Sequence, residues 1–222
     1  MLIKISIVCM DKRVFLKEVS RRLAIRYKKE LKTSLKFDTP WQLLVATILS
    51  AQSQDKQVNR ITVELFKKYP DIKDYIELKP SDLFKYVKYV GLYKNKSKNI
   101  IKAANYINEN FNLEIPKSIE ELIRIPGIGR KTANVVLSNA YNLNYGIAID
   151  THCITVANRL KLVRTKNPEK IERILMDNVD IRVRKDISHM FIALGRDTCT
   201  ARRKYCERCV LNKICPSSDF KG

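Results

Sequence analysis

The segment that most constrains this chain runs from residue 122 to residue 150 and predicts a helix, a tight turn and a second helix. Residues 118–121 form a capping box, so a short helix begins there. Pro126, Gly127 and Gly129 end that helix, because both glycines are able to adopt positive φ without steric cost. The turn therefore exposes backbone N–H groups at the start of the next helix, which is a phosphate-binding site by geometry and dipole.

Helical periodicity extends over most of the chain. Apolar residues at Ala133, Val136, Leu137 and Ala140 place one face of a helix after the turn. Similar spacing and helix-start signals predict helices over residues 13–31, 40–49, 58–66, 81–90, 96–110, 151–160, from 167 onward, and 183–194. With only 6 glycines and short connections, the sequence predicts an all-α fold.

Charge is the second constraint. Lys and Arg number 43 against 23 acidic residues, a formal net charge of +20. A solvated basic surface is one explanation, and a polyanion partner such as nucleic acid is the one that the hairpin favours. No apolar run approaches the roughly 20 residues of a membrane helix. We therefore expect a cytoplasmic protein, in which structural disulfides are rare.

The first nine residues, MLIKISIVC, precede all of these motifs. Their alternation of Ile3, Ile5 and Ile7 predicts either a short strand or an extension before a true start at Met10. Cys9 receives no role.

Four cysteines near the end of the chain predict a metal site. Cys199, Cys206, Cys209 and Cys215 have the spacing C-x6-C-x2-C-x5-C, and thiolates select soft metals. Zinc sites more usually contain two C-x2-C pairs, and disulfides are the remaining alternative. Cys153 lies in a helical segment and is expected to be a small buried hydrophobe.

These motifs together resemble the endonuclease III family of DNA repair glycosylases. LxxxPGIGRKTAxxV is similar to the family's helix–hairpin–helix, Lys131 follows it, and Asp150 lies in an IDTH segment before the cysteine quartet. The resemblance begins at about Asp11 and covers nearly all of the remaining chain. It implies two helical lobes: a six-helix lobe over residues 33–144, and a discontinuous iron–sulfur lobe over residues 1–32 and 145–222.

The resemblance also implies an activity in base excision repair. The family excises oxidised or fragmented pyrimidines from duplex DNA and cleaves the abasic site on its 3′ side by β-elimination. The expected partner is duplex DNA with damaged bases or abasic sites, and the expected state is a monomer. The preferred base is left open.

Lys131 and Asp150 are the expected catalytic residues. Lys131 would attack C1′ and form a Schiff base; positive neighbours and partial burial lower the pKa of such an amine. Asp150 would stabilise positive charge on the sugar and help to move a proton from Lys131. The alternatives are an ordinary surface lysine and a plain helix N-cap. His152 is either a supporting residue or a structural histidine.

The remaining roles also follow from the resemblance. The four cysteines would hold a 4Fe–4S cluster of structural function, bracing a basic loop with Arg202, Arg203 and Lys204 against phosphates. An enzyme that acts on a base must flip it out of the stack. Gln52 matches the residue that fills the gap, and Leu92 matches the wedge in the opposite strand. Asp55 either orients the amine or caps the next helix. The hairpin's DNA contacts are expected at Gly127, Gly129 and Arg130.

Two other functions fit parts of the pattern. Mismatch-specific thymine or adenine glycosylases share the same fold. The monofunctional enzymes among them typically lack a lysine at the position of Lys131. A non-enzymatic DNA-binding module would use the hairpin alone, and Lys131 with Asp150 disfavours it.

Overall fold

The computed structural model describes residues 11–28 and 31–220 of the chain. These residues form helices and contain no strand, which confirms the all-α prediction; one isolated antiparallel bridge joins Cys199 and Lys204. The strand considered for residues 1–9, and Cys9 with it, lies outside the described residues. In the described part of the chain, every helix is too short or too polar to cross a membrane.

The chain divides into two compact units, each with its own core. The hairpin unit is Thr33–Tyr145, and the cysteine unit combines Met1–Lys32 with Gly146–Gly222. The hairpin unit contains α2 (Pro40–Ser50), α3 (Asp55–Lys68), η3 (Ile72–Tyr75), η4 (Pro80–Leu83), α4 (Phe84–Val87), α5 (Tyr93–Phe111), α6 (Ile119–Leu122) and α7 (Arg130–Ala140). The cysteine unit contains α1 (Lys12–Tyr27), α8 (Thr151–Arg159), α9 (Pro168–Asn178), η5 (Ile181–Val183), α10 (Arg184–Asp197) and η6 (Cys206–Arg208). That the predicted lobes at 33–144 and at 1–32 with 145–222 are domains stays a prediction.

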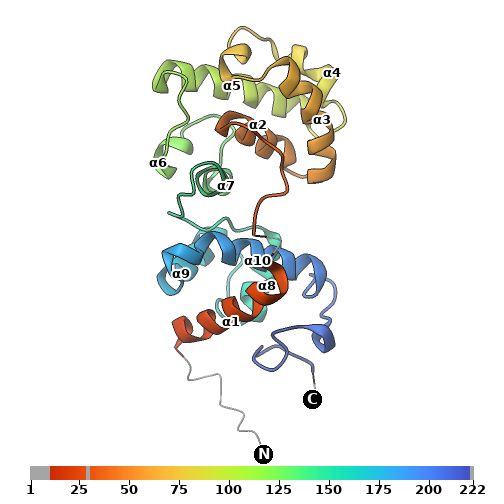
Figure 1. The fold of residues 1–222 in the computed structure, drawn as a ribbon, viewed down its shortest axis with the longest axis vertical. Coiled ribbons are helices and arrows are strands. Elements are labelled where there is room, and N and C mark those ends of the chain that lie inside the picture. The colour runs from red at the N-terminus through yellow and green to blue at the C-terminus, as the bar shows by residue number, and fades with distance from the viewer. Residues whose placement is uncertain (1–10, 29–30, 221–222) are drawn as a thin grey trace, which may run out of the picture. The chain divides into compact units, whose positions relative to one another are not determined.

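Helix α2 is the centre of the hairpin unit and contacts α3, α5 and α7 (Figure 1). Thr39 caps it by accepting a hydrogen bond from the backbone N–H of Gln42 over 3.2 Å, and Pro40 occupies its first turn. Seven apolar side chains along it are buried: Trp41, Leu43, Leu44, Val45, Ala46, Ile48 and Leu49. This confirms that α2 is buried on all sides, because other helices of the unit cover it.

Helix α10 has the corresponding place in the cysteine unit, where it contacts α8 and α1 (Figure 1). Phe191 on α10 and Leu16 and Leu23 on α1 are fully buried in this core. Cys153 on α8 is also fully buried, as expected for a small hydrophobe.

Two predicted helices differ from the structure. The first helix ends at Tyr27 rather than at residue 31, yet Leu31 still packs against the core from a bend, which explains its apolar spacing. Residues 81–90 form a 3₁₀ turn and one α-helical turn instead of a continuous helix. Lys79 at the cap donates its backbone N–H to the Asp82 carboxylate over 2.8 Å, which closes the tight 3₁₀ turn.

Candidate functional site

The hairpin turn is built from local interactions that the sequence predicts. Ser118 Oγ accepts a hydrogen bond from the N–H of Glu121 over 3.2 Å and donates one to its carboxylate over 2.7 Å. Of the two glycines that are able to adopt positive φ, Gly127 does so, at +81°. Gly129 is extended at φ −95° and is the N-cap of α7. The turn needs one left-handed residue because the extended N-cap already redirects the chain into α7.

Helix α7 begins without a side-chain cap. Its first ladder bond runs from Ala133 N to Gly129 O over 3.0 Å, so the N–H groups of residues 130–132 precede the ladder. Arg130 and Lys131 lie in this first turn. The Lys131 side chain is exposed, so the expected partial burial is not found.

Gln52 and Leu92 share an unusual backbone conformation. Gln52 follows α2 with φ 56°, and Leu92 is the N-cap of α5 with φ 57°. Both side chains are exposed, Leu92 by 62%. A left-handed conformation is costly for residues other than glycine and is found where the surrounding structure enforces it. The two residues that the sequence singled out for base flipping are therefore held outward on strained turns.

Asp150 is the N-cap of α8, as predicted by the alternative that it is a helix N-cap. Its Oδ1 accepts a hydrogen bond from the N–H of Cys153 over 2.9 Å, and the cap does not use Oδ2. Two side chains from other helices of the unit hydrogen-bond to the backbone just before Asp150. Glu172, only 3% exposed, accepts from the N–H of Ile147 over 3.1 Å, and Ser188 Oγ donates to Ala148 O over 2.7 Å. Asp150 thus has a fixed backbone and a carboxylate oxygen available for another partner.

The four cysteines come together in the cysteine unit. Cys199, Cys206, Cys209 and Cys215 line one small cavity, with Arg159 and Lys204 beside them. Burial, together with the neighbouring cysteines, raises the pKa of Cys209 and raises that of Cys215 to about 11. Among the described residues, no three side chains of the ligating types meet in the geometry of a metal ion. The structure does place the four thiols around one shared cavity.

The loop between the first two cysteines is tightly closed. Thr200 Oγ1 donates to Arg203 O over 2.9 Å and accepts from its N–H over 3.1 Å. Arg202 and Arg203 are exposed. The guanidinium carbon of Arg203 lies over the Tyr205 ring, 4.8 Å from the ring centroid. Lys204 instead donates to Ser217 O over 2.9 Å and pairs with Asp219. Two of the three predicted phosphate contacts therefore present their cations to solvent, and Lys204 joins the loop to the end of the chain.

Asp55 and His152 have structural contacts. Asp55 is the first residue of α3, whose N-cap is Gln54, and it accepts a hydrogen bond from the Ser34 hydroxyl. The alternative that Asp55 caps this helix is therefore wrong. His152 packs against Gly195, where an added Cβ would lie 2.7 Å from the His152 Cβ.

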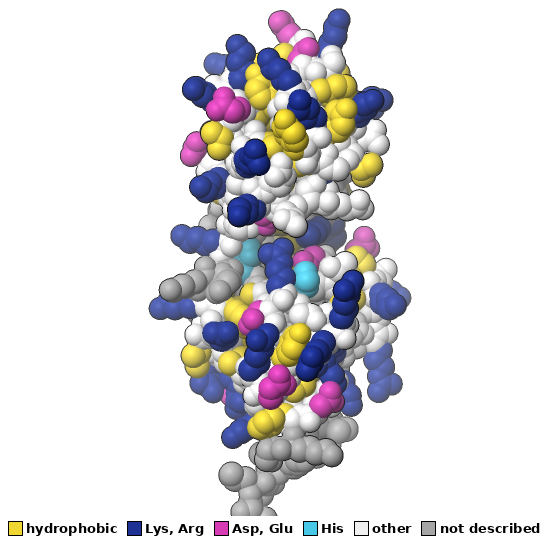
Figure 2. Space-filling view, turned by 90° about the vertical axis from the view of Figure 1, so that its right-hand side faces the viewer, with side chains coloured by type: hydrophobic (Ala, Val, Ile, Leu, Met, Phe, Trp, Pro, Cys, Tyr) yellow, Lys and Arg dark blue, Asp and Glu magenta, His cyan; other side chains and the backbone are white. Residues whose placement is uncertain are grey.

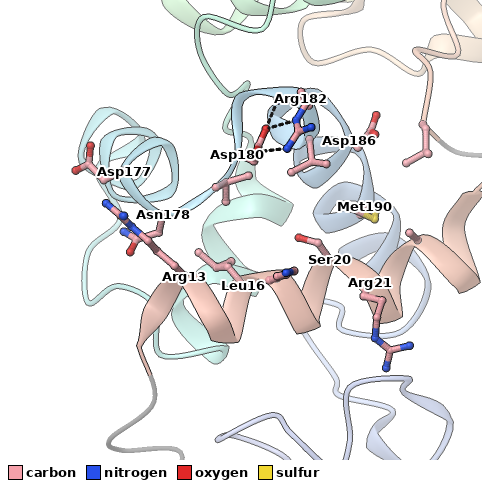
Figure 3. A pocket seen from close by; sticks show the side chains of 15 residues that line it. Arg13, Leu16, Ser20, Arg21, Asp177, Asn178, Asp180, Arg182, Asp186 and Met190 are labelled. Carbon is pink, nitrogen blue, oxygen red and sulfur yellow. Dashed lines mark hydrogen bonds and ion pairs between the residues drawn. The ribbon is translucent and has the colours of Figure 1, made fainter.

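A cavity elsewhere in the cysteine unit contains none of the predicted site residues. It is a groove of about 710 Å³ between α1, α9 and α10, with the Asp180–Arg182 ion pair at its edge (Figure 3). Lys and Arg side chains are spread over the face seen in Figure 2. The chemistry-bearing residues lie instead on turns and helix ends.

Comparisons with known proteins connect these features. Residues 45–180 match the family model described as HhH-GPD superfamily base excision DNA repair protein. The chain belongs to the HhH-GPD superfamily. Endonuclease III from Synechocystis sp. is 41% identical over 185 residues, covering 83% of this chain and 84% of that protein. This confirms the resemblance to the endonuclease III family.

Solved structures of this HhH-GPD branch agree with that relationship. A non-covalent endonuclease III–DNA complex has a TM-score of 0.86 at 33% identity, covering 94% of this chain and 97% of that one. A trapped endonuclease III–DNA covalent intermediate has a TM-score of 0.87 at the same identity and coverage.

Three polar contacts within the two units had no signal in the sequence motifs. Arg159 donates to Cys199 Sγ, Glu172 holds the segment before Asp150, and Lys96 is buried beneath the Gln52 turn. Each lies at an ordinary helix position, so only the tertiary structure identifies it.

Proposed function

We propose that this chain is a DNA glycosylase and AP lyase of base excision repair, acting on oxidised or fragmented pyrimidines in duplex DNA. The observation that carries the proposal is Lys131 in the first turn of α7, directly after the hairpin, in a chain 41% identical to an endonuclease III. A relative of the same fold has been trapped as a covalent intermediate with DNA, which supports nucleophilic chemistry.

Lys131 is the proposed nucleophile. Its neutral amine attacks C1′, the N-glycosidic bond breaks, and the bonding electrons leave with the base, which is then protonated. Opening of the sugar ring gives a Schiff base between Nζ and C1′. The Schiff base makes the C2′ proton acidic, and its removal expels the 3′ phosphate by β-elimination. Water then hydrolyses the imine and returns the amine.

Asp150 is the proposed electrostatic partner of this reaction. Positive charge develops on the sugar as the base departs, and an ionised carboxylate stabilises it. The N-cap bond to Cys153 uses Oδ1 and fixes the orientation of the group. The restraints from Glu172 and Ser188 on the preceding residues serve the same orientation.

DNA contacts are proposed at three turns of the hairpin unit and on the loop between Cys199 and Cys206 in the cysteine unit. The N–H groups at the start of α7, with Gly127, Gly129 and Arg130, face phosphates. Gln52 and Leu92 fill the space that a flipped nucleotide leaves, for which their strained, outward turns are suited. Arg202, Arg203 and Lys204 provide further positive charge near the backbone.

The donor set fits the 4Fe–4S cluster that the family implies. Four thiols line one cavity, and Arg159 donates a hydrogen bond to Cys199 Sγ over 3.2 Å, a contact of the kind that orients a metal ligand. When bound, the cluster would fix the loops that carry its ligands. The residues themselves position Arg202 and Arg203 through the Thr200 hydrogen bonds.

A nicking assay on a duplex with one abasic site tests the proposal. The wild-type chain should cleave on the 3′ side of the site without added metal, whereas a DNA-binding module would bind and leave the strand intact. A panel of duplexes with oxidised pyrimidines, a G·T mismatch and an A opposite an oxidised guanine separates the proposed substrate class from thymine or adenine removal.

A further inference from the structure

The first turns of α5 carry two side chains on one face of the helix. Lys96 and Asn99 are three residues apart, a spacing that aligns side chains along a helix, and Leu92 is the N-cap of this helix. Asn99 lies against the hairpin: a Cβ added to Gly127 would come within 2.7 Å of the Asn99 Cβ. The same helix end thus adjoins the Leu92 turn and the hairpin.

Lys96 connects this helix end to the third DNA-facing turn. Its Nζ donates to Leu49 O over 2.8 Å and to Ser53 Oγ over 3.0 Å. Leu49 is in the last turn of α2 and Ser53 follows Gln52, so the two acceptors flank the Gln52 turn. Lys96 N also donates to Leu92 O over 3.0 Å, which anchors the lysine to the other turn.

Packing alone does not explain a lysine at this position. Lys96 is only 5% exposed, and its burial lowers the pKa of the ammonium. Burying an ammonium is unfavourable unless its protons are used. The Leu49 carbonyl is an acceptor only, and the C-terminus of α2 favours a cation, so the protonated amine is suited to this place.

We propose that Lys96 is a positioning residue that ties the Gln52 turn to the Leu92 turn, so that both side chains enter the DNA stack together. The inference rests on the proposed function and goes beyond it by assigning a residue that contacts no DNA itself. Both turns hold a residue other than glycine at positive φ, and such a conformation persists only where neighbouring structure enforces it. The lysine side chain supplies that restraint at the Gln52 turn, and the backbone bond from Lys96 N to Leu92 O joins it to the Leu92 turn.

Lys96→Met tests the tie, because methionine fills similar space and removes both hydrogen bonds. The first readout is the fluorescence of 2-aminopurine placed opposite an abasic site, which rises when protein insertion disturbs its stacking. At saturating protein, wild type should raise the signal and Lys96→Met should raise it much less. The second readout is cleavage of an abasic site in a paired duplex and in a single strand. We expect a loss of roughly tenfold on the duplex and little change on the single strand.

Gln42→Met is the matched control. Gln42 is also buried in the hairpin unit, at 4% exposure, and its side chain also makes two hydrogen bonds, a local one with Asp38 N and a tertiary one with Pro70 O. It lies at the other end of α2 from the Gln52 turn, so Gln42→Met should keep the fluorescence rise and the duplex-to-single-strand ratio. Ser53→Ala removes one bond of the tie and should give a smaller loss in the same direction, even if Lys96→Met does not fold.

Three results would overturn the positioning role of Lys96. The first is an equal loss of cleavage on duplex and single strand, and the second is a matching loss in Gln42→Met. The third is a fluorescence rise in Ser53→Ala and Lys96→Met that equals the wild-type rise. A wild-type chain that produces the fluorescence rise but never cleaves would instead refute the proposed lyase function, and the fluorescence comparison would still decide the role of Lys96.

Discussion

Arg159 Nη1 lies 3.2 Å from Cys199 Sγ, and the same guanidinium donates to the carbonyl oxygens of Thr200 and Ala201 at 2.7 and 3.1 Å. Arg159 is the last residue of α8, and Asp150 is the N-cap of that helix. The loop of the first cysteine and the proposed catalytic carboxylate are therefore attached to opposite ends of one nine-residue helix.

Cys209→Ser should prevent retention of the proposed cluster and weaken DNA binding. Serine is a poor ligand for iron, and without the cluster the loop of Arg202 and Arg203 loses its support. Iron content and visible absorption after anaerobic purification measure the first effect, and titration with an abasic duplex measures the second. Cys153→Ala is the control, because Cys153 is buried in the core but does not line the cavity. Stoichiometric zinc without iron in the wild type would refute the cluster.

Gly127→Ala should weaken binding to damaged and undamaged duplex alike, because the hairpin contacts backbone and reads no base. Alanine at φ +81° is strained, and its Cβ would lie 2.7 Å from the Asn99 Cβ. We expect a cost of about 1–2 kcal/mol from the backbone alone. Gly129→Ala should lose less binding, because it keeps the backbone N–H proposed to face phosphate, its φ of −95° suits alanine, and an added Cβ meets no protein atom within 4 Å. Equal binding by the two variants would contradict this account of the turn.

Stability should fall as the pH is lowered from about 6.5 to about 4. Burial lowers the pKa of His189 from 6.5 to about 4, so between these values the unfolded chain binds a proton that the folded chain does not. Protonation then favours unfolding, by at most ~3 kcal/mol below both pKa values. Urea titrations across this range measure the slope, and His189→Gln should flatten it. An unchanged slope in that variant would assign the pH dependence to other groups.

Local features of the fold could be predicted from the sequence because local interactions decide them. Ser118 with Glu121 and Thr39 with Pro40 mark helix starts that the structure reproduces. The dipeptide Pro126-Gly127 likewise identifies the turn.

What the sequence did not reveal depends on contacts between distant residues. Nothing local predicts positive φ at Gln52 or Leu92, since neither is glycine. The buried positions of Lys96 and Glu172 depend on which helices pack over them. The exposure of Lys131 was also unexpected, because a residue's burial is a tertiary property.

Asp150→Asn should slow base release and leave DNA binding near the wild-type level. Asparagine keeps an oxygen for the N–H of Cys153, so α8 stays capped, while the negative charge is lost. Loss of an electrostatic stabiliser of this kind lowers the rate by on the order of a hundredfold or more. Single-turnover kinetics on a duplex with one oxidised pyrimidine measure the step. A rate within twofold of wild type would show that the carboxylate is only a cap.

Borohydride trapping tests the central claim, that Lys131 is the nucleophile. A Schiff base is reducible and a non-covalent complex is not, so wild-type protein with an abasic or damaged duplex should form a stable covalent adduct. Lys131→Gln should form none while binding the duplex nearly as well, and Lys102→Gln, which changes another exposed lysine of the same unit, should trap like wild type. Strong trapping by Lys131→Gln would show that another amine attacks the sugar, and the proposed mechanism would be wrong.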